Sequence, residues 1–388
     1  MKCNWITKKL SEIAIINPRE SLGKGVVAKK VPMDKLQPFC RDIPEFVLEE
    51  YKGGTKFRKD DTIMARITPC LENGKIAKVS VLSDGEVGFG STEYIVFRAI
   101  DGVSDADFLY YLICSPLVRN PAIKSMVGSS GRQRVQTDVV ANLDIELPPI
   151  EEQRNIGGLL KAIDDKIELN NKINNNLEQQ AKALYKDWFF DFSPFSTEGN
   201  LPDGWHLGTV GDIIQLHDSK RVPLSSSERD KMEKIYPYYG ATSLMDYVDN
   251  YLFDGIYLLL GEDGTVVDSL GFPILQYVYG QFWVNNHAHI ITGKEGFSVE
   301  ELYLFFSITN IKSIVTGAVQ QKVSQQNLKK VPAIIPSKEA LSAFDDLIQP
   351  IFAQIRNLRD ENAHLADLRD TLLPRLMSGE LDISNIEL

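Results

Sequence analysis

Apolar residues return at alternating steps of four and three along two separate stretches of the chain. This spacing is that of the a and d positions of a coiled coil, so it predicts two long amphipathic helices. The second set follows the first at a constant offset of 188 residues, as from Ile156 to Phe344, which places both helices in one register. The predicted seam positions are Ile156, Leu160, Ile163, Ile167, Asn174, Leu177, Leu184, Phe344, Ile348, Ile351, Ile355, Leu358, Asn362, Leu365 and Leu372.

Two such helices can bury their narrow apolar stripes against each other. The connecting chain leaves parallel and antiparallel pairing open, and the whole domain before the second helix allows the antiparallel arrangement. Asn174 and Asn362 are predicted to fix the register at some cost in stability. Pro350 is predicted to kink or break the second helix. The alternative is two unrelated surface helices, each packed on its own module.

The segments before the two helices also repeat each other. Trp5 corresponds to Trp205 at an offset of 200, and Gln133 corresponds to Gln321 at an offset of 188. A period of a whole domain plus a helix indicates a duplication rather than a solenoid. The first module is therefore the longer by a dozen residues.

Short runs rich in β-branched and aromatic residues, separated by turn residues, make both modules β-rich. Together with the paired helices they predict an α+β fold, in which two β-rich globular domains with pseudo-two-fold symmetry are joined by an antiparallel coiled coil. The expected strands span residues 62–67, 75–81, 93–98, 257–260, 273–279 and 288–292, and a helix is expected at 106–114.

Proline and linker-like composition set the predicted domain borders. Pro148 and Pro149 close the first module, and Ser337 is expected to cap the second long helix. The predicted segments are a first module at 1–150, a first helix at 151–192, a linker at 193–204, a second module at 205–336 and a second helix at 337–378.

The bulk composition is that of an ordinary globular protein with 43% apolar residues among 388. No apolar run approaches the length of a membrane span, and the N-terminus lacks the apolar core of a secretory signal. The four cysteines show no C-x-x-C pairing, so they are expected to be reduced thiols. These features predict a cytoplasmic protein.

The formal net charge of −11 argues against unselective coating of DNA. The charge is unevenly distributed, however, because residues 1–150 hold 21 Lys and Arg against 19 Asp and Glu. Residues 201–337 hold 10 against 15. Base reading remains compatible with this pattern if a basic partner supplies much of the grip on the phosphates.

Motifs for catalysis are missing from the sequence. It contains neither a phosphate-binding P-loop nor a convincing G-x-G-x-x-G, and no Asp/Asn-Pro-Pro-Tyr/Phe stretch for amino methylation. His287 and His289 share one strand face and are geometrically able to bind a metal, but no third histidine or cysteine recurs nearby. We therefore expect neither catalytic residues nor a metal or cofactor in this chain.

Small polar loops with basic and amide side chains are the better candidates for chemistry. Arg pairs bidentately with guanine and Gln with adenine in the major groove, and other donors meet phosphates. The two loops are residues 129–134 and 317–322. Either loop alone is compatible with an ordinary solvated surface loop, but the recurrence of the same residue types at an offset of 188 favours a function. The predicted DNA-binding residues are Arg66, Thr68, Lys75, Lys78, Ser129, Ser130, Arg132, Gln133, Arg134, Lys220, Arg221, Tyr238, Tyr239, Gln320, Gln321 and Lys322.

Several stretches carry a resemblance to a known family. They are Leu147-Pro148-Pro149-Ile150-Glu151-Glu152-Gln153-Arg154-Asn155-Ile156, Leu184-Tyr185-Lys186-Asp187-Trp188-Phe189-Phe190, Leu201-Pro202-Asp203-Gly204-Trp205 and Leu372-Leu373-Pro374-Arg375-Leu376-Met377-Ser378-Gly379-Glu380-Leu381. In these the chain resembles, over nearly its whole length, the specificity (S) subunit of type I restriction–modification systems. It departs from the family at the second helix entry, where Ser337-Lys338-Glu339-Ala340 replaces the usual Glu-Gln motif.

The resemblance implies a subunit without catalytic activity. Each target-recognition domain is expected to read one half of a bipartite site in double-stranded DNA, and the coiled coil to set the spacer and dock two methylation (M) subunits. Those partners are expected to carry S-adenosylmethionine, and restriction (R) subunits to add ATP and Mg²⁺ chemistry. Two alternatives remain: an enzyme, such as a methyltransferase or nuclease, with an unrecognised active site, and a scaffold that binds protein rather than DNA.

Overall fold

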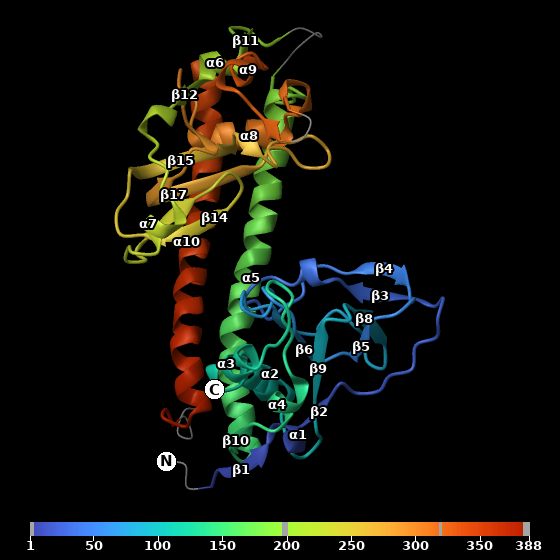
Figure 1. Ribbon diagram of the computed structural model, residues 1–388. Coiled ribbons are helices and arrows are strands. Elements are labelled where there is room, and N and C mark those ends of the chain that lie inside the picture. Colours follow the sequence, from blue (N-terminus) through green and yellow to red (C-terminus); the bar gives the residue numbers. More distant parts are fainter. Residues whose placement is uncertain (1–3, 196–200, 318–319, 383–388) are drawn as a thin grey trace. The chain divides into compact units, whose positions relative to one another are not determined.

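The chain forms two compact units in a computed structural model that describes residues 4–195, 201–317 and 320–382. The first unit combines residues 1–171 with 359–388, and the second consists of residues 172–358. Each unit thus joins one β-rich part to one half of each long helix (Figure 1). The predicted segment borders separate the helices from the modules, whereas the units divide each helix near its middle.

The first unit contains two four-stranded sheets and a short two-stranded ribbon. The ribbon pairs β1 (Ile6–Lys9) with β10 (Asp144–Leu147). The sheets have the orders β2 (Ala14–Ile16), β9 (Tyr94–Ala99), β6 (Thr62–Ala65), β7 (Ile76–Lys78) and β4 (Val47–Glu50), β3 (Val27–Val31), β8 (Val87–Gly90), β5 (Thr55–Arg58). Its short helices are α1 (Leu10–Ile13), α2 (Ala106–Cys114), α3 (Pro116–Lys124) and α4 (Thr137–Ala141), with a 3-10 turn at Met33–Lys35.

The second unit is built around one six-stranded sheet. The sheet has the order β12 (Ile214–Leu216), β18 (Ala288–Gly293), β15 (Phe253–Gly261), β17 (Leu275–Val284), β13 (Tyr236–Tyr239), β14 (Leu244–Val248). Two ribbons pair β11 (His206–Thr209) with β20 (Pro332–Ile335) and β16 (Asp263–Gly264) with β19 (Gln321–Lys322). The short helices are α6 (Val210–Ile213), α7 (Ser226–Arg229), α8 (Val299–Ile308) and α9 (Gln325–Leu328), with 3-10 turns at Asp218–Lys220 and Lys312–Ile314.

The two units share their strand topology. In each, a three-strand core is antiparallel (β2-β9-β6 and β12-β18-β15) and one further pair is parallel (β3 with β8, β13 with β17). The second unit has one long antiparallel pair, β15 with β17, where the first has the two shorter pairs β5 with β8 and β6 with β7. The long strands of the second unit hold its sheet together, and the shorter strands of the first leave two sheets.

Most of the predicted elements are present. The helix expected at 106–114 is α2, and every expected strand overlaps an observed one. Two strands of the first unit are shorter than predicted, since β6 ends at Ala65 and β7 at Lys78. The α+β class with two repeated β-rich parts is confirmed.

The two long helices are α5 (Ile150–Phe189) and α10 (Lys338–Met377). Every predicted seam position on them is buried or half-buried. In the first unit Asp164 contacts Arg369 and Asn170 contacts Asn362, so residue numbers rise on one helix as they fall on the other. This order shows that the helices pair antiparallel.

Asparagines form a polar contact within the first unit's part of the seam. Asn170 Nδ2 donates to Asn362 Oδ1 over 2.9 Å, and Asn362 Nδ2 donates to Asn171 Oδ1 over 2.8 Å. Asn174 is 6% exposed, and its Oδ1 accepts no hydrogen bond from the described residues. Positions that correspond by the 188 offset therefore do not face each other, because antiparallel pairing reverses one helix.

Two predictions concern α10: a cap at Ser337, which is confirmed, and a break at Pro350, which is wrong. Ser337 caps the helix as expected, because its Oγ accepts a hydrogen bond from the Ala340 amide over 3.2 Å. The predicted break at Pro350 is wrong, since α10 remains helical across it. Pro350 lies on the exposed side of the helix, where water can reach the backbone carbonyl that loses its hydrogen bond.

A buried polar contact fastens the helices to the first unit. Asp164 of α5 is 5% exposed, accepts a hydrogen bond from the Tyr111 hydroxyl over 2.6 Å and pairs with Arg369 Nη1 of α10 over 2.8 Å. The same core cluster includes apolar residues of α2, α3, α4, α5 and α10. One carboxylate thus connects three helices through directional bonds inside an apolar core.

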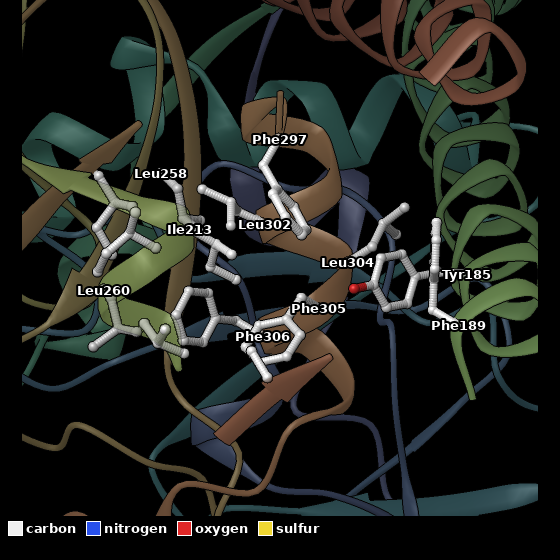
Figure 2. Close-up of a cluster of buried hydrophobic side chains, with 14 of the residues drawn as sticks. Tyr185, Phe189, Ile213, Leu258, Leu260, Phe297, Leu302, Leu304, Phe305 and Phe306 are labelled. Carbon is white, nitrogen blue, oxygen red and sulfur yellow. The ribbon is translucent and has the colours of Figure 1, made fainter. Parts of the chain in front are cut away.

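Aromatic and aliphatic side chains fill the core of the second unit. Figure 2 shows α8 between the sheet and α5: Ile213, Leu258 and Leu260 lie on one side of its Leu302 and Phe306, and Tyr185 and Phe189 on the other. Phe344 of α10 packs against Phe189, with ring centroids 4.8 Å apart. The aromatic residues at the end of α5 therefore have a structural role in this core.

We expect Asp164→Ala to lower the free energy of unfolding by about 3 kcal/mol, because it leaves buried partners without their acceptor. Asp370→Ala is the matched control, since Asp370 also pairs with Arg369 but its side chain is 59% exposed. The control should lose less than about 1 kcal/mol. Urea unfolding of both variants gives the comparison, and equal losses would contradict a dominant role for the buried carboxylate.

Glu301 is a buried carboxylate in the first turn of α8. Its Oε2 accepts a hydrogen bond from the Ser298 amide over 2.7 Å, while its Oε1 has no partner among the described residues. Burial raises the pKa of Glu301 from 4.5 to about 8. The folded protein therefore keeps a proton that the unfolded chain releases above about pH 4.5, so unfolding becomes easier as the pH rises from 4.5 to 8.

Glu301→Gln should stabilise the protein above pH 8, on the order of 3 kcal/mol, and leave its stability at pH 4 almost unchanged. The reason is that glutamine keeps the amide cap and cannot ionise. Glu228→Gln is the matched control, because Glu228 caps α7 in the same way from an exposed position. Thermal unfolding at pH 4 and pH 9 measures both; a gain at pH 4 equal to that at pH 9 would exclude ionisation as the cause.

Candidate nucleic-acid interface

The loop before Val135 in the first unit folds back against the end of strand β6. Val127 and Ile67 each form an isolated β-bridge with Arg134. The Thr68 amide donates to the Gln133 carbonyl over 3.0 Å. Gly128 has a φ of +138°, and a Cβ there would lie 2.8 Å from the Arg132 carbonyl oxygen, so the turn requires glycine.

Side chains at the base of this loop form a charged cluster. Arg134 binds Glu93 with Nη2 at 2.6 Å and Nε at 3.0 Å. This hydrogen bond holds the pKa of Glu93 below its usual value, and the Arg66 charge adds to the effect. Arg66 Nη2 donates to the Val135 carbonyl over 3.3 Å, while its buried Nε has no partner among the described residues.

The structure thus brings together seven of the predicted DNA-binding residues. Arg66, Thr68, Gln133 and Arg134 form the base of the loop, and the exposed tip carries Ser129, Ser130 and Arg132.

Two predicted lysines of the first unit are engaged elsewhere. Lys75 Nζ donates to the Met33 carbonyl over 2.9 Å. The side chain of Lys78 is 12% exposed and forms ion pairs with Asp107 and Asp60. Its charge is therefore balanced within the protein, which does not support the predicted phosphate contact.

The second unit repeats the loop with the same backbone register. Asp263 pairs with Lys322 and Gly264 with Gln321, as Ile67 pairs with Arg134 in the first unit. The Val323 amide donates to the Glu262 carbonyl over 2.9 Å, just as the Val135 amide donates to the Arg66 carbonyl over 2.8 Å. Gln320 is exposed in this loop, whose residues 318–319 lie outside the described part of the chain.

Acidic residues surround the base of the second loop. Lys322 Nζ lies 3.5 Å from Glu262 Oε1 and 3.4 Å from Asp263 Oδ1. Arg221, with its side chain 14% exposed, pairs with Glu262 Oε2 over 2.6 Å and also donates to the Ala288 carbonyl over 2.8 Å. Arg221 therefore supports the loop from below instead of standing free for a phosphate.

The other predicted residues of the second unit have different environments. Lys220 is exposed. Tyr238 is 1% exposed, and its hydroxyl accepts a hydrogen bond from the Leu224 amide over 3.1 Å, so its position does not support the predicted DNA contact. Tyr239 is half-buried, with its ring centroid 5.9 Å from that of Phe282.

Asp218, Glu262 and His289 converge closely enough to suggest a metal site. Both ring nitrogens of His289 are already engaged, Nδ1 with Asp218 Oδ2 at 2.7 Å and Nε2 with the Val323 carbonyl at 2.8 Å. The Arg221 guanidinium pairs with Glu262 where a cation would bind. Although burial opposes it, the hydrogen bond with His289 lowers the pKa of Asp218. This donor set does not fit a metal ion, because the chain's own groups occupy it.

Two residues at the loop bases escaped the sequence analysis, namely Glu93 and Glu262. Each is an acidic residue beside the end of a strand, a common surface position without any motif. Only the folded chain brings Glu93 to Arg134, 41 residues later in the sequence, and Glu262 to Lys322, 60 residues later.

The chain repeats a β-rich unit on a pair of long helices, and each unit presents a polar loop with basic and amide side chains beside a strand end. Such side chains are suited to contacts with nucleic acid. The chain belongs to the family of the type I restriction modification DNA specificity domain. The family model matches twice, at residues 4–179 and 202–363. This family supplies the non-catalytic specificity part of its systems.

Named relatives agree with the family assignment. The chain is 26% identical over 314 residues to the type I restriction enzyme MjaIX specificity subunit of Methanocaldococcus jannaschii, covering 74% of this chain and 71% of the relative. It is 24% identical over 403 residues to the HindI specificity subunit of Haemophilus influenzae, covering 84% and 87%. The crystal structure of the S subunit from M. genitalium has the same fold, with a TM-score of 0.56, 17% identity and 96% coverage of both chains. Among the described residues, none of the helices is long and apolar enough to span a bilayer.

Arg132→Ala should weaken binding of the full chain to a DNA duplex that carries its recognised sequence by about tenfold. The slope of log affinity against log salt should also become shallower by up to about one if the contact is to a phosphate. Lys59→Ala is the control, since Lys59 precedes the opposite end of β6 and pairs with Asp84. Fluorescence anisotropy between 50 and about 200 mM salt gives both quantities; wild-type affinity in Arg132→Ala would remove the tip from the interface.

Proposed function

We propose that this chain directs a type I restriction–modification complex to a bipartite DNA site, each unit reading one half. The observation that carries the proposal is the loop that recurs with one backbone register on both units. The side chains on that register differ, with Arg66, Arg132 and Arg134 in the first unit against Glu262, Gln320 and Lys322 in the second. Different donors and acceptors on a shared frame suit two different half-sites.

We further propose that the helix pair sets the spacer and offers the surface on which two methylation subunits dock. Long helices with a fixed antiparallel register support this role, because a helix holds its length to 1.5 Å per residue. The partners would carry S-adenosylmethionine for adenine-N6 methylation, and restriction subunits would add ATP, Mg²⁺ and cleavage. Residues 1–150 hold 21 Lys and Arg against 19 Asp and Glu, a small positive excess. So small an excess agrees with partner subunits that provide much of the phosphate contact.

The test is to express the chain with its methylation partner and map N6-methyladenine by long-read sequencing. We expect one motif made of two short specific parts separated by a fixed unspecific gap. Exchanging residues 1–150 for the corresponding module of a relative should change one part of the motif and leave the other. A motif unaffected by the exchange would contradict the proposal, and methylation by the purified chain alone would favour an enzyme instead.

A further inference from the structure

Each of the two loops has a carboxylate at its base that pairs with the basic residue at the end of the loop and is also influenced by a second basic side chain. In the first unit Glu93 binds Arg134 of the loop and is also under the influence of the Arg66 charge. In the second unit Glu262 lies 2.6 Å from Arg221 and 3.5 Å from Lys322 of the loop. Arg134 and Lys322 occupy the same place in the shared register.

The two carboxylates reach the loop from different strands. The Arg66 amide donates to the Glu93 carbonyl over 2.9 Å, and the Glu262 amide donates to the His287 carbonyl over 2.8 Å. Glu262 therefore stands at the backbone position of Arg66, and His287 at that of Glu93. The acidic residue has changed place between the units, yet in both it meets the basic residue that ends the loop. Because the two carboxylates stand at different backbone positions, they are not copies of one ancestral residue. A requirement for the carboxylate contact itself explains their common placement better.

A carboxylate is an unfavourable neighbour for DNA, because it repels the phosphates that supply most of the unspecific affinity. A carboxylate can, however, fix the position and orientation of a basic side chain. An Arg–carboxylate pair with two parallel bonds fixes the guanidinium plane. Arg134 makes such a pair, because its Nη2 donates to Glu93 Oε1 over 2.6 Å and its Nε to Glu93 Oε2 over 3.0 Å. A recognition group must be held to within about 0.5 Å to discriminate between bases. An unheld basic side chain can instead follow any phosphate within its reach.

We infer that Glu93 and Glu262 are positioning residues for DNA specificity, because each holds the basic side chain at the end of its loop in place. This contact lowers the affinity for unspecific DNA and increases the discrimination between base pairs. The inference rests on the proposed function, since it takes the loops as the DNA-reading elements. Neither carboxylate needs to touch a base: each acts through the basic side chain that it holds. The exposed fractions of the two carboxylate side chains, 22% and 14%, agree with a role beneath the contact surface.

The test uses the full chain with its methylation partner and duplexes that carry the motif found by methylation mapping, or that motif with single base-pair changes in one half. Glu93→Gln should reduce discrimination in the half-site of the first unit by about tenfold and leave the other half-site unchanged. Glu262→Gln should do the converse. Both should bind a duplex without the motif as well as or up to about threefold more tightly than the unsubstituted chain, with a salt dependence steeper by up to about one phosphate.

Matched variants separate positioning from general effects. Glu49→Gln and Asp254→Asn remove the same charge from surface contacts to Lys30 and Gln281, and should alter neither half-site. Glu93→Asp keeps the charge and should recover part of the lost discrimination. Thermal unfolding of each variant sets a temperature at which all are folded, and binding is compared there.

The inference is overturned if Glu93→Gln and Glu262→Gln keep full discrimination, or if they lose affinity for all duplexes equally. It is also overturned if Glu93→Asp is as unselective as Glu93→Gln, because the residue then serves only the fold. A different failure belongs to the proposed function: if the unsubstituted complex shows no two-part motif, the loops are not reading DNA in this way.

Discussion

Burial of two narrow apolar stripes against each other is the constraint on which both units depend. Neither α5 nor α10 can leave its stripe in water, and each half of the pair also forms one wall of a unit's core. In the first unit the helices contribute Ile156, Leu160 and Leu376 to that core, and in the second Tyr185, Phe344 and Ile348. The helix pair is therefore part of each folding unit rather than a rod attached to finished domains.

Polar contacts select one arrangement within this apolar packing. In the first unit Asp164 takes a bond from Tyr111 and pairs with Arg369, and in the second Arg356 of α10 pairs with Glu300 of α8 over 3.0 Å. Buried pairs of this kind add little net stability compared with apolar packing, but a wrong arrangement would leave charges unpaired. They are suited to selecting one register of the helices against each β-rich part.

The loops that end at Arg134 and Lys322 carry different side chains on one backbone frame. Backbone bonds place Val135 and Val323 against Arg66 and Glu262 in the same way, so the two loops share one backbone frame although the side chains there differ. The side chains above that frame then differ in charge from unit to unit. In the function proposed above, this separation of backbone frame and side chains gives each unit its own specificity without a change of fold.

The sequence by itself determined the repeat, the two helices and most strands, because these depend on local periodicity that a single segment expresses. It also placed Ser129, Arg132 and Gln133 on one loop, because neighbours in sequence stay neighbours in space. Which residues of the two helices face each other was decided by the antiparallel pairing, as where Asn362 meets Asn170 and Asn171. Only the tertiary structure decided that Lys78 and Arg221 are engaged in ion pairs, that Tyr238 is buried, and that Glu93 and Glu262 meet the loops. Those outcomes depend on which distant residues share a charge or a cavity, and no local pattern records that.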